Sequence, residues 1–184
     1  MQYADELKPV DLETVRQSAR DARGYIDAVY LHWSAGRYGQ IYEDYHISID
    51  KDGRIYFPDD CGDFTVKREH TYHRNSNSIG IAICGCFDAQ ANSGYNLTLG
   101  SNPITDAQIE AMAAIVAIIC KEAFVPLNRV LTHCEAAFRD GYGPFSGDTE
   151  TRWDLWFIPD SAYGNELRPG GEVLRGKAAW YMQH

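Results

Sequence analysis

Residues 25–33, YIDAVYLHW, decide the class of fold, because Val29 and Leu31 alternate there with Tyr30 and His32. Alternation with a period of two is typical of a β-strand. It directs Val29 and Leu31 to one face of the predicted strand. Tyr30 and His32 point to the other face. His32 therefore stands at the end of a strand, where functional sites tend to form.

The segments around this strand alternate between helix and strand patterns. Asp11 is a predicted N-cap for a helix that reaches about Arg20, and Thr105 with Gln108 forms a capping box before a longer apolar helix. The predicted strands are a hairpin in YHISIDKDGRIYF (45–57), a buried run SIGIAICG (78–85) and a short strand at Val130 and Leu131. This order predicts an α/β fold with a central sheet flanked by helices.

Bulk composition bounds the function only loosely. The chain of 184 residues suits one domain, and its formal charge of −9 argues against nucleic acid as a partner. The first residues, MQYADELKPVDLETV, lack the basic and apolar regions of a secretory signal, and no stretch is apolar enough to span a membrane. These features predict a soluble chain that is made in the cytoplasm and does not enter a membrane.

Five segments of the sequence, taken in their order along the chain, form a recognisable pattern. They are YLHWSAG, DYHISIDKDGRIY, HTYHRNSNSIGIAICG, VLTHCE after a Thr-capped helix, and RWDLW. In this order they resemble the zinc-dependent N-acetylmuramoyl-L-alanine amidases, the family of bacteriophage lysozyme-type amidases and peptidoglycan recognition proteins. The resemblance spans about residues 25–156. It implies a single domain with a mixed central sheet and helices on both faces.

The resemblance also implies a metal site. In the family, the first zinc ligand is the histidine that closes the first core strand, here His32, and the second follows a helix and a short strand, here His133. The third ligand is a Cys or Asp near the end of the domain, here Asp154. Two imidazoles and a carboxylate suit Zn²⁺, and three protein ligands leave a fourth position for water.

The third ligand has competitors in this chain. Asp140 and Asp148 also lie between His133 and the Trp-rich segment, and Cys134 carries a thiol that zinc favours. Asp154 is preferred because a basic residue stands two positions before it, as in the family. Cys134 is disfavoured because sequence neighbours rarely both reach one tetrahedral ion.

Two residues carry catalytic roles by resemblance. Tyr45 matches the tyrosine that hydrogen-bonds the attacking water or the developing oxyanion. Arg152 stands where related amidases have a lysine, and it would stabilise negative charge on the tetrahedral intermediate. Arginine keeps the charge of lysine but is a poor proton donor.

Three residues are expected to contact substrate. His70 aligns with a histidine that lines the groove, and Asn77 with an asparagine before the Ser-Ile-Gly strand that contacts the muramyl-peptide. Trp33 is a candidate aromatic wall for a sugar ring.

The expected function is therefore zinc-dependent hydrolysis of the amide between N-acetylmuramic acid and L-alanine, with peptidoglycan or muropeptides as substrate. A phage or prophage endolysin that acts on the wall after release is favoured. The alternatives are a cytoplasmic amidase that recycles anhydro-muropeptides, a peptidoglycan-binding module without activity, and a metallopeptidase that cuts the stem peptide. The expected organisation is an N-terminal helical segment (1–24), the catalytic domain (25–160) and a C-terminal tail with a short helix (161–184).

Overall fold

A computed structural model of the chain describes residues 1–58, 62–91, 97–144 and 153–184. The helices are α1 (Leu12–Asp21), α2 (Asp106–Glu122), α3 (His133–Arg139) and α4 (Gly170–Gln183). The strands are β1 (Gln2–Tyr3), β2 (Ala28–Trp33), β3 (Gln40–Ile41), β4 (Ile47–Ile49), β5 (Ile55–Tyr56), β6 (Ser78–Ile83), β7 (Gln90–Ala91), β8 (Leu97–Thr98), β9 (Val130–Thr132), β10 (Phe157–Asp160) and β11 (Glu166–Pro169).

Within these residues, a five-stranded sheet in the order β5-β4-β6-β2-β9 forms the centre of the fold. The strands β4, β6, β2 and β9 run parallel, and only the edge strand β5 is antiparallel. In the register between β2 and β6, His32 lies level with Ala82. Parallel strands end on the same side of a sheet, so the carboxyl ends of β2, β6 and β9 share one edge.

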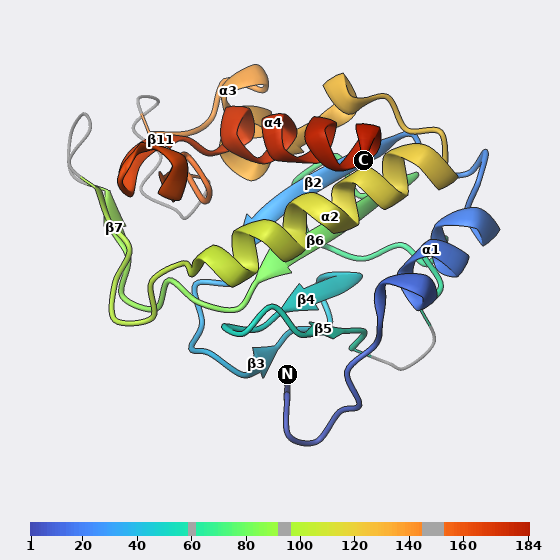
Figure 1. Cartoon of the computed structure of the whole chain (residues 1–184), viewed down its shortest axis with the longest axis horizontal. Helices are drawn as coiled ribbons and strands as arrows, with labels where there is room; N and C mark the ends of the chain where they lie inside the picture. The colour runs from blue at the N-terminus through green and yellow to red at the C-terminus, as the bar shows by residue number, and fades with distance from the viewer. Residues whose placement is uncertain (59–61, 92–96, 145–152) are drawn as a thin grey trace.

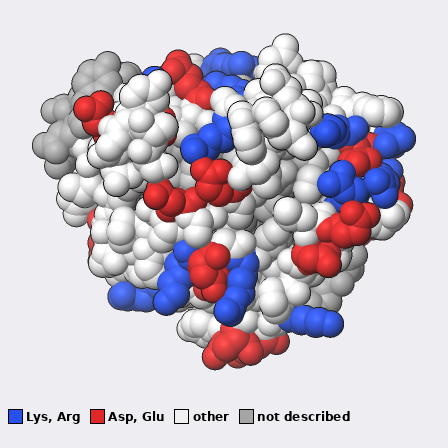
Figure 2. Space-filling model, in the orientation of Figure 1, with Lys and Arg blue, Asp and Glu red and all other residues white. Residues whose placement is uncertain are grey.

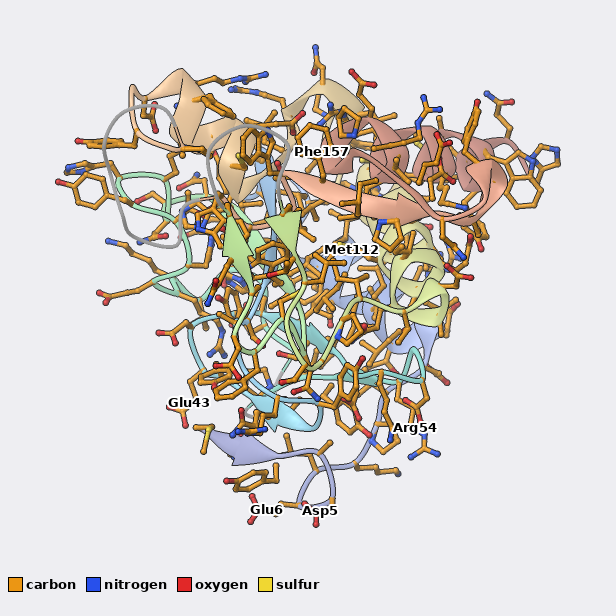
Figure 3. The ribbon with its side chains drawn as sticks, turned by 90° about the vertical axis from the view of Figure 1, so that its left-hand side faces the viewer. Asp5, Glu6, Glu43, Arg54, Met112 and Phe157 are labelled. Carbon is orange, nitrogen blue, oxygen red and sulfur yellow. The ribbon has the colours of Figure 1, made fainter. Side chains whose placement is uncertain are left out.

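One face of the sheet is covered by α2, with α1 and α4 packed beside it (Figure 1). The predicted capping box starts α2, because the hydroxyl of Thr105 accepts from the backbone N–H of Gln108 and the Gln108 side chain accepts in return. Helix α2 buries its apolar residues over the main core, which includes Val29 and Leu31 of β2. Figure 3 shows Met112 of α2 in the interior of the molecule, where it is fully buried.

The opposite face of the sheet carries a smaller core under α3. Ala28 and Tyr30 of β2 pack there with Leu131 of β9 and Ala136 of α3. Adjacent residues of a strand point to opposite faces. The structure thus confirms a mixed sheet with helices on both faces, and the side chain of His32 belongs to the face that carries α3.

The N-terminal helix ends at Asp21, close to its predicted end, and the two strands of the hairpin are shorter than the predicted segment. Asp11 caps α1, and the hairpin of β4 and β5 turns at Gly53, whose φ of 81° lies in the left-handed region. The first residues also contain a strand, β1, which pairs with β3. The tail after residue 161 contains β11 and the 14-residue helix α4.

Acidic and basic side chains are interspersed over the face shown in Figure 2. Part of this mixture is ion pairing, since Arg16 and Arg20 both contact Glu122. None of the described helices combines the length and the apolar character needed to cross a lipid bilayer.

Candidate metal centre and active site

The two candidate histidine ligands lie at the carboxyl ends of neighbouring strands. His32 is the penultimate residue of β2, and His133 follows directly after β9. Because Leu31 is paired with Thr132 in this parallel ladder, the next residue along each strand is a histidine. Backbone hydrogen bonding alone therefore brings the two imidazoles together, with ring centroids 4.8 Å apart.

His133 is also fixed by the start of α3. The hydroxyl of Thr132 accepts from the backbone N–H of Glu135, and the Glu135 side chain accepts from the N–H of Thr132. This reciprocal pair is a capping box, and it makes His133 the first residue of the helix. Arg175 of α4 donates to both carboxylate oxygens of Glu135, at 2.7 and 2.8 Å. The C-terminal helix therefore supports the turn that carries His133.

Asp154 reaches the same place from a turn at residues 153–155, just before β10. Its carbonyl accepts a long hydrogen bond of 3.4 Å from the backbone N–H of Cys134. The preceding Trp153 packs edge-on against Trp33, with ring centroids 4.9 Å apart. Because Trp33 is next to His32, this aromatic contact attaches the Asp154 segment to the end of β2.

The donor atoms of His32, His133 and Asp154 converge. Nδ1 of His32 lies 3.1 Å from Oδ2 of Asp154, and Nδ1 of His133 lies 2.9 Å from Oδ1. One donor atom from each residue falls within 4.8 Å of the others, close enough for the three to hold one metal ion. Among the described residues, this is the only such group of His, Cys, Asp or Glu.

The electrostatics of the group also fit a cation. Burial opposes ionisation of Asp154, but the charges and hydrogen bonds of His133 and His32 outweigh it and lower its pKa to about 2. Burial lowers the pKa of His32, against the effect of Asp154. Asp154 Oδ1 is buried, and its one close polar neighbour among the described residues is Nδ1 of His133, which leaves acceptor capacity on this oxygen. A buried carboxylate with unused acceptor capacity beside two imidazoles is the donor set that Zn²⁺ prefers.

Tyr45 stands beside this group. Its ring centroid is 5.1 Å from that of His32. Burial, followed by the charge of Asp154, raises the pKa of Tyr45 well above its ordinary value of 10.0. The phenol therefore stays protonated at neutral pH and is a hydrogen-bond donor rather than a base. None of the described residues hydrogen-bonds its hydroxyl, so that donor is available to a ligand.

His70 lies behind His32, away from the surface. It is 5% exposed, and burial together with the neighbouring His32, His46 and His133 lowers its pKa to about 2. Its Nδ1 contacts the hydroxyl of Thr71 at 2.9 Å, and the same hydroxyl contacts Nε2 of His32 at 3.2 Å. This position favours support of His32 over contact with substrate. Sequence reasoning missed Thr71, although the residue directly follows His70.

The structure does not bring Trp33 or Asn77 to the group. Trp33 is 3% exposed and belongs to the core on the other face of the sheet, because it alternates with His32 along β2. Asn77 precedes β6 at the amino end of the sheet, level with Asp27 and five residues before His32. At about 3.3 Å per residue, this places Asn77 roughly 16 Å from the histidine. The left-handed φ of 54° at Asn77 explains why an asparagine suits this turn.

The described alternatives to Asp154 have other roles. Cys134 is buried, and this burial raises the pKa of its thiol, so it remains a packed neutral side chain outside the donor group. Asp140 forms a bidentate ion pair with Arg74 instead. Arg152 and Asp148 lie outside the described residues.

Comparison with known proteins gives a finding that does not depend on this geometry. No curated protein matches the sequence at a significant level. The family described as N-acetylmuramoyl-L-alanine amidase matches residues 10–144, which is more than half of the chain. The match includes His32 and His133 and stops before Asp154. The chain therefore belongs to the N-acetylmuramoyl-L-alanine amidase family.

Proposed function

We propose that this protein is a zinc-dependent amidase that hydrolyses the bond between the lactyl group of N-acetylmuramic acid and L-alanine. The observation that carries the proposal is the convergence of His32, His133 and Asp154 at the carboxyl edge of the sheet, in a chain of the amidase family. Two imidazoles and one carboxylate form a typical catalytic zinc site. When bound, the ion supplies Lewis acidity and a water acidic enough to attack an amide at neutral pH.

Tyr45 is the proposed hydrogen-bond donor to the reacting carbonyl. Its phenol is protonated and lies next to His32. As the amide is attacked, negative charge grows on the carbonyl oxygen. A fixed O–H donor then interacts more strongly with the oxygen than it did in the bound substrate, which lowers the barrier.

Arg152 is the proposed second source of positive potential. It stands two positions before Asp154 in the sequence. Its guanidinium is charged at every working pH, so its contribution to the reaction is electrostatic.

We propose intact peptidoglycan, in the manner of an endolysin, as the substrate. The support is the resemblance of Tyr45 and the His-Thr-Tyr segment at 70–72 to the phage and recognition branches of the family. Clearing of purified sacculi, compared with turnover of soluble anhydro-muropeptides at equal concentration of lactyl amide, tests this choice. Faster turnover of the soluble fragments would favour a recycling amidase.

The reaction is tested by digesting purified peptidoglycan with zinc-loaded protein and identifying the products by mass spectrometry. We expect a new free amine on L-alanine and an intact stem peptide. Cleavage inside the stem would identify a metallopeptidase instead.

The variant Asp154→Ala separates an enzyme from a binding module. We expect it to lose hydrolysis while it still sediments with insoluble peptidoglycan. Asp52→Ala is the matched control, because this carboxylate lies in the exposed turn of the hairpin, where it pairs with Arg54. Equal amine release by wild type and Asp154→Ala would refute the proposed site.

A further inference from the structure

The hydroxyl of Thr71 lies between two imidazoles. Its Oγ1 is 3.2 Å from Nε2 of His32 and 2.9 Å from Nδ1 of His70. All three side chains are buried. A hydroxyl has one proton, so it donates to one of these nitrogens and accepts from the other. The direction of this pair of hydrogen bonds therefore decides which ring nitrogen of each histidine carries a proton.

Ser78 fixes which atoms donate in these hydrogen bonds, because its own proton is already used. Its hydroxyl donates to the backbone carbonyl of Arg74 at 2.7 Å, and a carbonyl can only accept. Ser78 Oγ then acts as an acceptor toward Nε2 of His70, which lies 3.4 Å away. Nε2 of His70 therefore carries the proton, and Nδ1 of the same ring carries a lone pair.

The proton position on His70 also determines the proton position on His32, because Thr71 connects the two rings. Thr71 donates to Nδ1 of His70, so it accepts from Nε2–H of His32. The lone pair of His32 is then on Nδ1, the atom that lies 3.1 Å from Oδ2 of Asp154. Two acceptors at this distance repel each other unless a positive charge lies between them, a shared proton in the metal-free protein or the metal ion in the loaded one.

We propose that Thr71 is a positioning residue that acts through His32. With His70 and Ser78, it places the ring proton of His32 on Nε2 and presents Nδ1 to the metal. This inference rests on the metal site of the proposed function. Hydrogen bonds to the second nitrogen of a metal-binding histidine fix its tautomer and orientation, and their loss typically costs about 10–100-fold in metal affinity.

Gly80 leaves room for this chain of hydrogen bonds, because glycine has no side chain. The imidazole of His70 lies directly on Gly80, where an added Cβ would come within 2.4 Å of Cγ of His70. Even alanine would displace the ring. The Ser-Ile-Gly segment thus supplies both the acceptor, Ser78, and the space that His70 needs to reach Thr71.

The test compares Thr71→Val, which has the same shape without the hydroxyl, with Thr71→Ser, which restores it. Thr65→Val is the control, because Thr65 lies in a turn and its hydroxyl donates to the nearby carboxylate of Asp63. Zinc affinity is measured by competition with a chromophoric chelator, which requires no activity. We expect Thr71→Val to bind zinc about 10–100-fold more weakly, with wild-type affinity in the other two variants.

Nitrogen-15 NMR of the imidazoles in the wild-type protein tests which ring nitrogen of His70 and His32 carries the proton. We expect the proton of His70 on Nε2 and, in the zinc-bound protein, the proton of His32 also on Nε2. A proton on Nδ1 of His70, or unchanged zinc affinity in folded Thr71→Val, would overturn the inference. The spectrum of the wild type decides the matter if Thr71→Val does not fold. A protein that binds zinc as predicted but cleaves no peptidoglycan would refute the proposed function and leave this inference standing.

Discussion

The two halves of the proposed metal site are held in different ways. His32 and His133 extend two strands that are paired in register, and His133 is fixed further by the capping box of α3. Asp154 lies in a turn outside the sheet, held by the contact of Trp153 with Trp33, by the buried Leu155 and by backbone hydrogen bonds that include a long one from Cys134. The family match covers both histidines and stops before the aspartate.

This difference shows how a single site combines a rigid and an adjustable part. Strand pairing and a helix start fix atoms through many backbone hydrogen bonds, so a histidine there has little freedom. A carboxylate on a turn has fewer such bonds and depends more on side-chain contacts. We therefore expect loss of a histidine ligand to abolish the site, and exchange of the aspartate for another zinc ligand to retain part of it.

The largest effect is expected for His32→Ala. Loss of this ligand should reduce amide hydrolysis by on the order of 10³-fold or more and remove bound zinc. Asp154→Cys should retain zinc and a measurable part of the activity, because thiolate is a zinc ligand and the segment can adjust to its length. Metal content and amine release measure both variants. Equal and complete inactivation of the two would contradict the distinction between the halves.

Tyr45→Phe should have the next largest effect. Removal of one donor to a developing oxyanion typically costs about 10²–10³-fold in kcat. The pKa of Tyr45 is raised, so the loss should be the same from pH 6 to pH 9, where the phenol remains protonated. Zinc content should be unchanged. A variant with normal kcat and weakened zinc binding would show that Tyr45 supports the metal instead.

Much of the fold and the histidine half were predictable from sequence, because local signals specify them. Alternation along β2 places His32, and a capping box starts α2. The sequence also contains a second capping box, Thr132 with Glu135, which would have predicted the start of α3. The alternation that directs His32 to the site also directs Trp33 to the opposite face, so the expectation that Trp33 contacts substrate conflicted with the strand pattern.

Other features depended on contacts that no local pattern contains. Asn77 lies far from the site because β6 runs parallel to β2, and strand direction is a property of the whole sheet. Thr71 reaches His32 across 39 positions of sequence. The contact of Trp153 with Trp33, which attaches Asp154, is likewise a product of tertiary packing.

Trp153→Ala should have a moderate effect that is confined to the aspartate half. Without the contact to Trp33, Asp154 becomes less restricted, and we expect zinc affinity to fall about 10-fold. Trp180→Ala is the control, since Trp180 is exposed on α4 and stacks on His184. Chelator competition measures both. The assignment of an anchoring role to Trp153 fails if the two variants bind zinc equally well.

Arg175→Met should have the smallest effect, on the histidine half. Burial opposes ionisation of Glu135, but the hydrogen bond from Arg175 lowers its pKa below the ordinary 4.5. A carboxyl group with a lowered pKa stabilises the fold at pH values above its unfolded pKa, and this contribution disappears as the pH falls through the folded pKa.

Arg175→Met should therefore lower the free energy of unfolding by about 1 kcal/mol at pH 7, and the difference from wild type should shrink below about pH 4.5. Urea denaturation at pH 7 and pH 3 measures it. Arg54→Met, at an exposed pair with Asp52, is the control. A difference that persists undiminished at pH 3 would mean that the side chain of Arg175 acts by packing rather than by charge.

The central claim is that both halves meet at one ion, and a crystal structure of the zinc-loaded protein with anomalous data at the zinc edge tests it most directly. We predict a single zinc peak with Nδ1 of His32, Nδ1 of His133 and a carboxylate oxygen of Asp154 at about 2.0–2.2 Å. A zinc ion held by Cys134, or one from which Asp154 is absent, would contradict the account.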